Sequence, residues 1–160
     1  MNTSSMTNDE LRNVIENHQR QQAFHLPAYA AALDELQLRE GPALNLDVTI
    51  NRILKAAASR SFLSYGDVAD ANGCAWQAVR RQMPKHLDRV LAKAHGRGAP
   101  LITSIVVNAE NRLSGKLEPA SLSGFVAGSE RLGIKVLDPE NFLRAQQDAT
   151  FDYAARHRTL

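Results

Sequence analysis

The sequence predicts a mostly helical α+β domain in which a helix-turn-helix precedes a short β-hairpin, with further helices at both termini. The chain has 160 residues, of which 44% are hydrophobic, and this is enough for one compact domain with a core. Most apolar residues recur at helical spacing, whereas one β-branched segment, LITSIVV, is typical of a strand. The composition excludes a large multidomain enzyme, a disordered chain and, because no apolar run is long enough, a membrane-spanning protein.

The first part of the chain is predicted to be a flexible start over residues 1–8 followed by N-terminal helices over residues 9–60. The helices expected there run over Asp9–Ala23, Ala28–Arg39 and Leu46–Ser59. Gly41-Pro42 should end the second helix, because glycine suits the residue after a helix and proline cannot continue one.

Residues 61–157 are predicted to form a winged-helix-like domain with C-terminal helices. Short helices are expected over Tyr65–Ala71, Ala75–Met83 and Lys85–His95, separated by the turn Asn72-Gly73 and by Pro84. Leu101–Val107 should be a strand, with Arg112–Ser114 returning beside it as the second strand of a hairpin. Two further helices should begin at Pro119 and at Asp138-Pro139.

Positive charge is concentrated in one part of this domain. Between Arg80 and Arg97 there are six cations and one acid, Asp88, although the net charge of the whole chain is only +2. Such a concentration favours the approach of a polyanion from one side. A solvated helical surface is the alternative interpretation.

A helix-turn-helix places its second helix in a groove of DNA while the first helix supports it, and a strand hairpin after it is the order of a winged helix. The second helix would carry Trp76, Gln77, Arg80 and Arg81. Glutamine pairs with adenine edges, and arginine pairs with guanine or phosphate. The candidate contacts that continue this surface are Lys85, Arg89 and, in a basic turn that could meet one phosphate, Arg97.

The run SYGDVADANGCAWQAVRRQM, followed by ITSIVVN, resembles the winged-helix C-terminal domain of the DNA alkyltransferases and alkyltransferase-like proteins. The resemblance covers Ser64 to Asn108. It implies that Tyr65 lies near the phosphate of a flipped nucleotide and that Gln77 stands where the family has an intercalating arginine. It also places Thr103 at the alkyl-accepting cysteine and Ser104 at the neighbouring histidine.

The departures from this family argue against alkyl transfer. A threonine hydroxyl without a paired base is a poor nucleophile, since alkyl acceptance needs a thiolate. Because the arginine wedge is also missing, a duplex-binding surface is what remains; Trp76 could serve as an apolar wedge or lie in the core. The span from Ser61 to Ala154 also resembles a group of bacterial proteins that contain GAPLITSIVVN, which implies no activity but places the C-terminal helices in the same domain.

Other chemistry finds little support in the residues. The histidines have no partners at metal-ligand spacing, and the sequence contains no phosphate-binding glycine loop, so no metal or cofactor is expected. Cys74 is the single cysteine and therefore cannot form an intramolecular disulfide, and the N-terminus shows no secretory signal; a cytoplasmic location is expected.

The sequence therefore predicts a non-catalytic protein whose partner is double-stranded DNA. The residues expected to contact the nucleic acid are Tyr65, Trp76, Gln77, Arg80, Arg81, Lys85, Arg89 and Arg97. Two alternatives stay open: a helical adaptor that binds a protein partner or a second copy of itself, and a small hydrolase that uses Thr103 or Ser104.

Overall fold

The computed structural model describes residues 1–157, which form a mostly helical α+β fold. The helices are α1 (Asn8–Arg20), α2 (Pro27–Glu40), α3 (Leu46–Ala58), α4 (Tyr65–Ala71), α5 (Trp76–Val79), α6 (Met83–Gly96), α7 (Pro119–Arg131) and α8 (Pro139–Arg156). The strands are β1 (Leu63–Ser64) and β2 (Val106–Val107), and the 3₁₀ turns are η1 (Thr3–Ser5), η2 (Ile102–Ile105) and η3 (Ala109–Asn111). None of the helices described is both long and apolar enough to cross a lipid bilayer.

Local chemistry explains where the helices begin. Thr7 and Ser64 each accept a hydrogen bond from the third residue of the following helix, whose acidic side chain bonds back to the cap backbone. These reciprocal bonds satisfy amide groups that the first helical turn leaves free. Four helices, α2, α6, α7 and α8, instead carry a proline in their first turn, where a missing N–H costs nothing.

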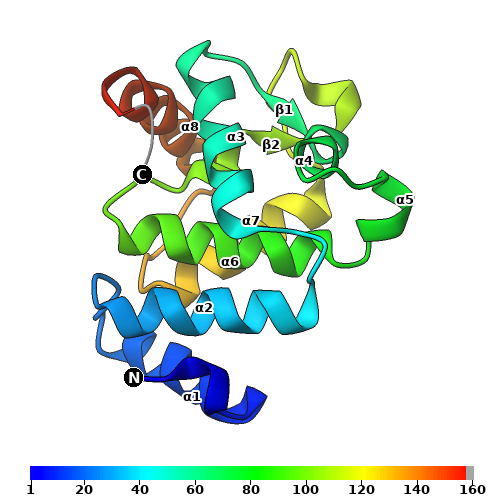
Figure 1. Ribbon diagram of the computed structural model, residues 1–160. Helices are drawn as coiled ribbons and strands as arrows, with labels where there is room; N and C mark the ends of the chain where they lie inside the picture. Colours follow the sequence, from blue (N-terminus) through cyan, green and yellow to red (C-terminus); the bar gives the residue numbers. More distant parts are fainter. Residues whose placement is uncertain (158–160) are drawn as a thin grey trace.

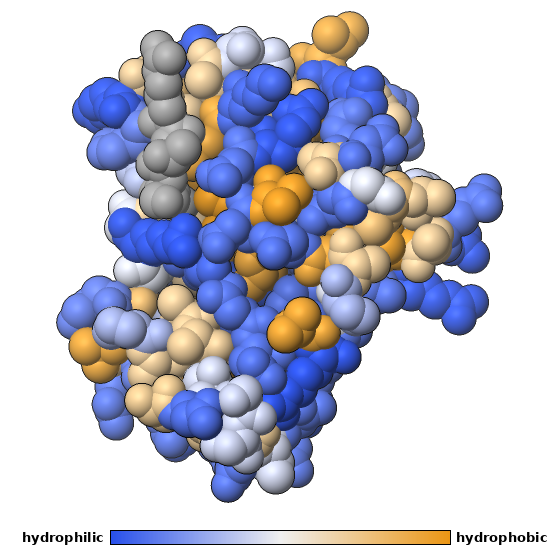
Figure 2. All heavy atoms as spheres, in the orientation of Figure 1, coloured by the Kyte–Doolittle hydropathy of each residue, from blue (hydrophilic) through white to orange (hydrophobic). Residues whose placement is uncertain are grey.

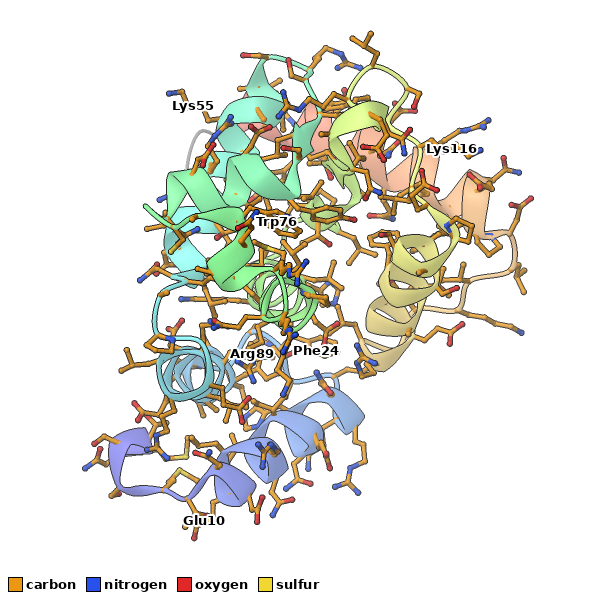
Figure 3. All side chains as sticks on the ribbon, turned by 90° about the vertical axis from the view of Figure 1, so that its right-hand side faces the viewer. Glu10, Phe24, Lys55, Trp76, Arg89 and Lys116 are labelled. Atoms are coloured by element: carbon orange, nitrogen blue, oxygen red, sulfur yellow. The ribbon has the colours of Figure 1, made fainter. Side chains whose placement is uncertain are left out.

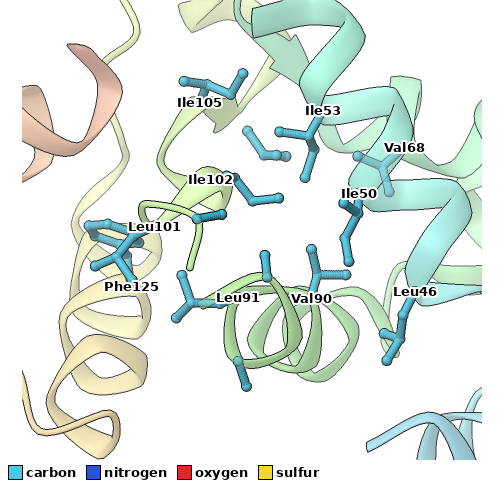
Figure 4. Close-up of a cluster of buried hydrophobic side chains, with 14 of the residues drawn as sticks. Leu46, Ile50, Ile53, Val68, Val90, Leu91, Leu101, Ile102, Ile105 and Phe125 are labelled. Carbon is cyan, nitrogen blue, oxygen red and sulfur yellow. The ribbon is translucent and has the colours of Figure 1, made fainter. Parts of the chain in front are cut away.

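The helices surround α6. In Figure 1, α1, α2 and α6 lie one above another, and α3 crosses from α2 to the upper part of the molecule, where α8 and the strands lie. α6 packs against α2, α3, α7 and η2, and α3 packs against α8 as well. One hydrophobic core joins these elements, so residues 9–60 and 61–157 share it; Figure 4 shows Ile50 and Ile53 of α3 facing Val90 of α6 and Ile102.

The start of the chain is attached to α2. The guanidinium of Arg39 donates to the backbone oxygens of Thr3, Ser4 and Met6, at distances of 2.7 to 3.3 Å. The polar composition of this segment predicts a flexible start, but these bonds fix it to the surface of α2.

The β structure differs from the expected hairpin. Leu63 and Ser64 pair in parallel with Val106 and Val107, and this is the only sheet within residues 1–157. The predicted returning strand, Arg112–Ser114, is a turn. Ile102–Ile105 forms a 3₁₀ turn because this apolar run is buried on all sides among α3, α6 and α8 and has no long neighbouring strand to pair with.

The predicted second helix of the helix-turn-helix is also shorter than expected. Helix α5 is a single turn, Trp76–Val79, and residues 80–82 form the turn that leads into α6 at Met83. Pro84 has no N–H to donate to the carbonyl of Arg80 four residues earlier, so the α5 helix cannot continue unbroken into α6. Where the sequence predicts a helix-turn-helix, the structure has α4 followed by one exposed turn.

Candidate nucleic-acid interface and adjoining cavity

The fold divides the cationic stretch of residues 80–97 into an interior part and a surface part. Arg89 belongs to the interior: its side chain is 8% exposed, it donates to Gln37 Oε1 at 3.3 Å, and it forms an ion pair with Glu40 (Figure 3). Arg12 and Lys85 also contact Glu40. Burial alone would raise the pKa of Glu40, but the cations outweigh it, led by Arg89, and hold that pKa below its ordinary value.

Lys93 and Arg97 form a second ion-pair group one and two turns further along α6. Lys93 is 2% exposed, and its Nζ lies 2.6 Å from Asp34 Oδ1 and 3.0 Å from Asp47 Oδ1. Arg97 Nη2 lies 3.2 Å from the same oxygen of Asp47. Both cations are neutralised by acids of α2 and α3.

The expectation that these residues form one outward basic face is therefore wrong for Arg89 and Lys93, and Arg97 is already paired. The reason is their spacing: residues four apart lie on one face of a helix, and this face of α6 meets α2 and α3. A signal was present in the sequence, since α2 and the start of α3 carry Asp34 and Asp47. The sequence also shows the apolar stripe on α6, but that stripe does not indicate that the face carrying Arg89 and Lys93 is covered by α2 and α3.

The surface part lies at the corner formed by α5 and the turn into α6. Trp76, Gln77, Arg80 and Arg81 are all exposed there. Neither arginine forms a salt bridge with any residue of 1–157. In Figure 2 the right-hand edge, where Figure 1 places α5, combines weakly hydrophobic atoms with hydrophilic side chains that project outward. We refer to these four residues as the α5 corner.

An aromatic pair supports this corner from behind. The rings of Tyr65 and Trp76 stack with their centroids 6.1 Å apart and an interplanar angle of 20°. Tyr65 Oη donates to Ser121 Oγ of α7 at 3.0 Å, and burial raises the pKa of the Tyr65 phenol. Tyr65 thus fixes the indole of Trp76 and links α4 to α7, while its hydroxyl is engaged within the protein.

A cavity of about 1030 Å³ opens between α4, α5, α6, α7 and η3. The residues that line it include the aromatic Trp76, Tyr65 and Phe125 and the aliphatic Leu87 and Leu91. Thr103, which the alkyltransferase resemblance places at the alkyl acceptor, also lines it, whereas Ser104 does not. Figure 3 shows Trp76 on the side of α5 that faces this region.

Four of the charged side chains at the cavity are bound to one another in two pairs. Arg112 donates to Ser64 Oγ at 2.9 Å and to Asp67 Oδ1 at 3.0 Å, and Arg131 lies 2.7 Å from Asp88 Oδ1. These bonds link η3 to α4 and α7 to α6, so they hold the walls of the cavity in place.

One residue of α7 faces this cavity without filling it. Gly124 lies within a helix, and a Cβ added there would meet no atom within 4 Å. Replacing Gly124 with alanine should raise the free energy of unfolding by about 1 kcal/mol, because glycine lowers helix stability by that amount relative to alanine. Urea unfolding followed by circular dichroism measures the change.

The matched change at Gly96 should have the opposite sign. Gly96 ends α6, and a Cβ there would come within 2.4 Å of the backbone oxygen of Phe24. Gly96→Ala should lower the free energy of unfolding by about 2 kcal/mol, since the backbone must shift. A loss of stability in Gly124→Ala would contradict the open space assigned to that position.

The predicted hydrolase nucleophiles have no catalytic surroundings. Ser104 is fully buried, and its hydroxyl lies 3.5 Å from Thr150 Oγ1. Thr103 has no side-chain hydrogen bond, to a histidine or otherwise, within the described residues. The same part of the chain also shows no cluster of histidine, cysteine and acidic side chains that would hold a metal ion.

The cavity and Gly124 are the features that sequence reasoning missed. Periodicity identifies which face of a helix is apolar, but it does not show whether two apolar faces pack together or leave a cavity between them. Searches of protein-family models, curated protein sequences and solved structures find no match to this chain.

Proposed function

We propose that this protein binds double-stranded DNA through the α5 corner and carries out no chemistry on it. The observation that supports this is the pair Arg80 and Arg81: two exposed guanidinium groups, unpaired within residues 1–157, beside the exposed amide of Gln77 and the indole of Trp76. Elsewhere in the cationic stretch the charges are matched internally, so this corner is where the stretch offers cations to a polyanion.

The chemistry of the four side chains fits nucleic acid. Arginine forms paired hydrogen bonds with phosphate oxygens or with the major-groove edge of guanine, and glutamine does so with adenine. An indole at the same corner can pack against sugar or base surfaces. Because only two free arginines are involved, the footprint is small, and we expect modest affinity that depends strongly on salt.

The proposal narrows the set of DNA contacts. Arg89 and Arg97 are engaged with acids, and Tyr65 acts behind Trp76 through its bond to Ser121. Lys85 remains a supporting cation, since its side chain is 65% exposed. The alkyltransferase resemblance supports binding without alkyl transfer, because position 103 holds a threonine where that reaction needs a thiolate.

The double reversal Arg80→Glu/Arg81→Glu should abolish the binding of a short duplex, because attraction to phosphate becomes repulsion. The double replacement by alanine should reduce the slope of log affinity against log salt by about two, one for each lost phosphate contact. Fluorescence anisotropy with a labelled duplex at several salt concentrations measures both effects.

The control reverses two cations outside the corner. Lys135→Glu/Arg144→Glu makes the same change in net charge at exposed positions before and within α8. Affinity in this variant should fall much less than in the corner variant. Equal losses in the two variants, or unchanged binding in the corner variant, would show that the α5 corner is not the DNA-binding surface.

A further inference from the structure

The cavity beside the α5 corner has the features of a binding site for a small molecule. Its volume of about 1030 Å³ is at the upper end of the range of small-molecule pockets in proteins. Leu87 and Leu91 of α6 and Phe125 of α7 supply apolar lining, and the stacked pair Tyr65 and Trp76 adds aromatic surface. These walls are held apart by the bonds of Tyr65, Arg112 and Arg131 between neighbouring elements.

Gly124 lies where α7 borders the cavity. Glycine within a helix is destabilising, and it is retained in proteins where a positive φ or a close contact requires it. Gly124 has neither: it is not among the glycines of positive φ, and nothing would meet its Cβ within 4 Å. Gly124 is exposed at the border of the cavity, so a larger side chain has room there and would take up part of the space open to an occupant.

The polar groups of the cavity indicate the kind of occupant. The hydroxyl of Thr103, a residue 9% exposed, and the side-chain amide of Asn108 both line the cavity and make no hydrogen bond within residues 1–157. The charges do not select an ion, because cations and acids are equal in number along the lining and two of each are bound together, Arg112 with Asp67 and Arg131 with Asp88.

We infer that the cavity binds a neutral, largely apolar small organic molecule, with the Thr103 hydroxyl and the Asn108 amide contacting its polar atoms. The cavity borders Trp76 and Arg80 of the α5 corner, but its apolar wall, Thr103 and Asn108 lie outside that corner, so the ligand site does not depend on the DNA contact.

The test uses two fluorescent probes with the same ring system. N-phenyl-1-naphthylamine is neutral, and 8-anilinonaphthalene-1-sulfonate adds one negative charge to that scaffold. Titrated into the full chain, the neutral probe should bind saturably at one site, and at least tenfold more tightly than the sulfonate. Tighter binding of the sulfonate, or no saturable binding of the neutral probe, would overturn the inference.

The variant Gly124→Leu should weaken the binding of the neutral probe at least tenfold, while its melting temperature stays equal to or above that of the unchanged protein. Its control is Ser123→Leu, an exposed neighbour on α7 that does not line the cavity, which should leave binding within twofold. Unchanged binding in Gly124→Leu would place the probe elsewhere and overturn the assignment.

A competition experiment separates this site from the DNA contact. Saturating duplex DNA should leave the neutral probe bound. Arg81 does not line the cavity, so Arg81→Glu should weaken the binding of DNA without changing the affinity for the probe. Displacement of the probe by DNA would show that the cavity is part of the nucleic-acid site. If DNA fails to bind at all, the probe result still stands by itself.

Discussion

Replacing Glu40 with alanine should lower the free energy of unfolding by about 3 kcal/mol, because it leaves the interior guanidinium of Arg89 without its anion. The Arg89 side chain is 8% exposed and that of Glu40 is 17% exposed, so water compensates poorly for the lost partner. After the change, Arg89 keeps one hydrogen bond, to Gln37 Oε1. Urea unfolding at neutral pH measures the loss.

Three further variants test whether the effect belongs to the buried pair. Replacing both partners, as Glu40→Leu/Arg89→Met, should recover most of the stability, because a buried ion pair is often no better than apolar side chains of similar size. Arg12→Ala and Lys85→Ala should each cost less than about 1 kcal/mol, since these cations are 46% and 65% exposed. A double variant as unstable as Glu40→Ala would contradict this account.

The helices and their starting points could be predicted from the sequence because their causes are local. Ser64 and Asp67 form a capping box that needs no other part of the chain, and α4 begins and ends at the residues expected. Pro119 and Pro139 likewise mark the first turns of α7 and α8. These signals act within four residues, so tertiary packing does not alter them.

The environment of α6 could not be predicted in the same way. Leu87, Val90 and Leu91 indicate one apolar stripe, which is typical of a surface helix. The structure covers the opposite charged face too, because α2 and α3 bring acids to Arg89 and Lys93. Ion pairing between elements far apart in the chain leaves no periodic signal, and it removes three of the six cations from the expected basic surface.

The strand prediction was wrong for a related reason. A short, fully buried run such as residues 101–107 is compatible with a buried strand or with a buried turn, and periodicity does not separate them. Here only Val106 and Val107 find a partner, the two residues of β1. Sequence reasoning did bring Tyr65, Trp76 and Gln77 into one region, but the cavity beneath them depends on the distance of α7, which no local pattern encodes.

Acid should destabilise the protein through His86, starting at a pH where most proteins are still stable. His86 is 1% exposed on the inner side of α6; its Nε2 lies 2.7 Å from Thr49 Oγ1, and its Nδ1 has no partner within residues 1–157. Burial, with a smaller contribution from Arg89, lowers the pKa of His86 to about 4 from an ordinary value of 6.5.

The direction of the effect follows from proton uptake. Below pH 6.5 the histidine of the unfolded chain binds a proton, whereas that of the folded chain stays neutral until about pH 4. The unfolded state therefore binds more protons in this window, and stability falls as the pH falls. At pH 4 the loss from this one group should reach about 3 kcal/mol, from about 1.4 kcal/mol for each unit of pKa difference.

The variant His86→Gln separates this effect from the titration of carboxylates. Its stability at pH 7.5 should be lower than that of the unchanged protein, but its decline between pH 7.5 and pH 4 should be smaller by about 3 kcal/mol. Glu40 and Asp47, whose pKa values are lowered, add their losses at lower pH in both proteins. Parallel stability curves over pH 7.5 to 4 would mean that His86 is protonated in the folded state, and that the space between α3 and α6 admits water to its ring.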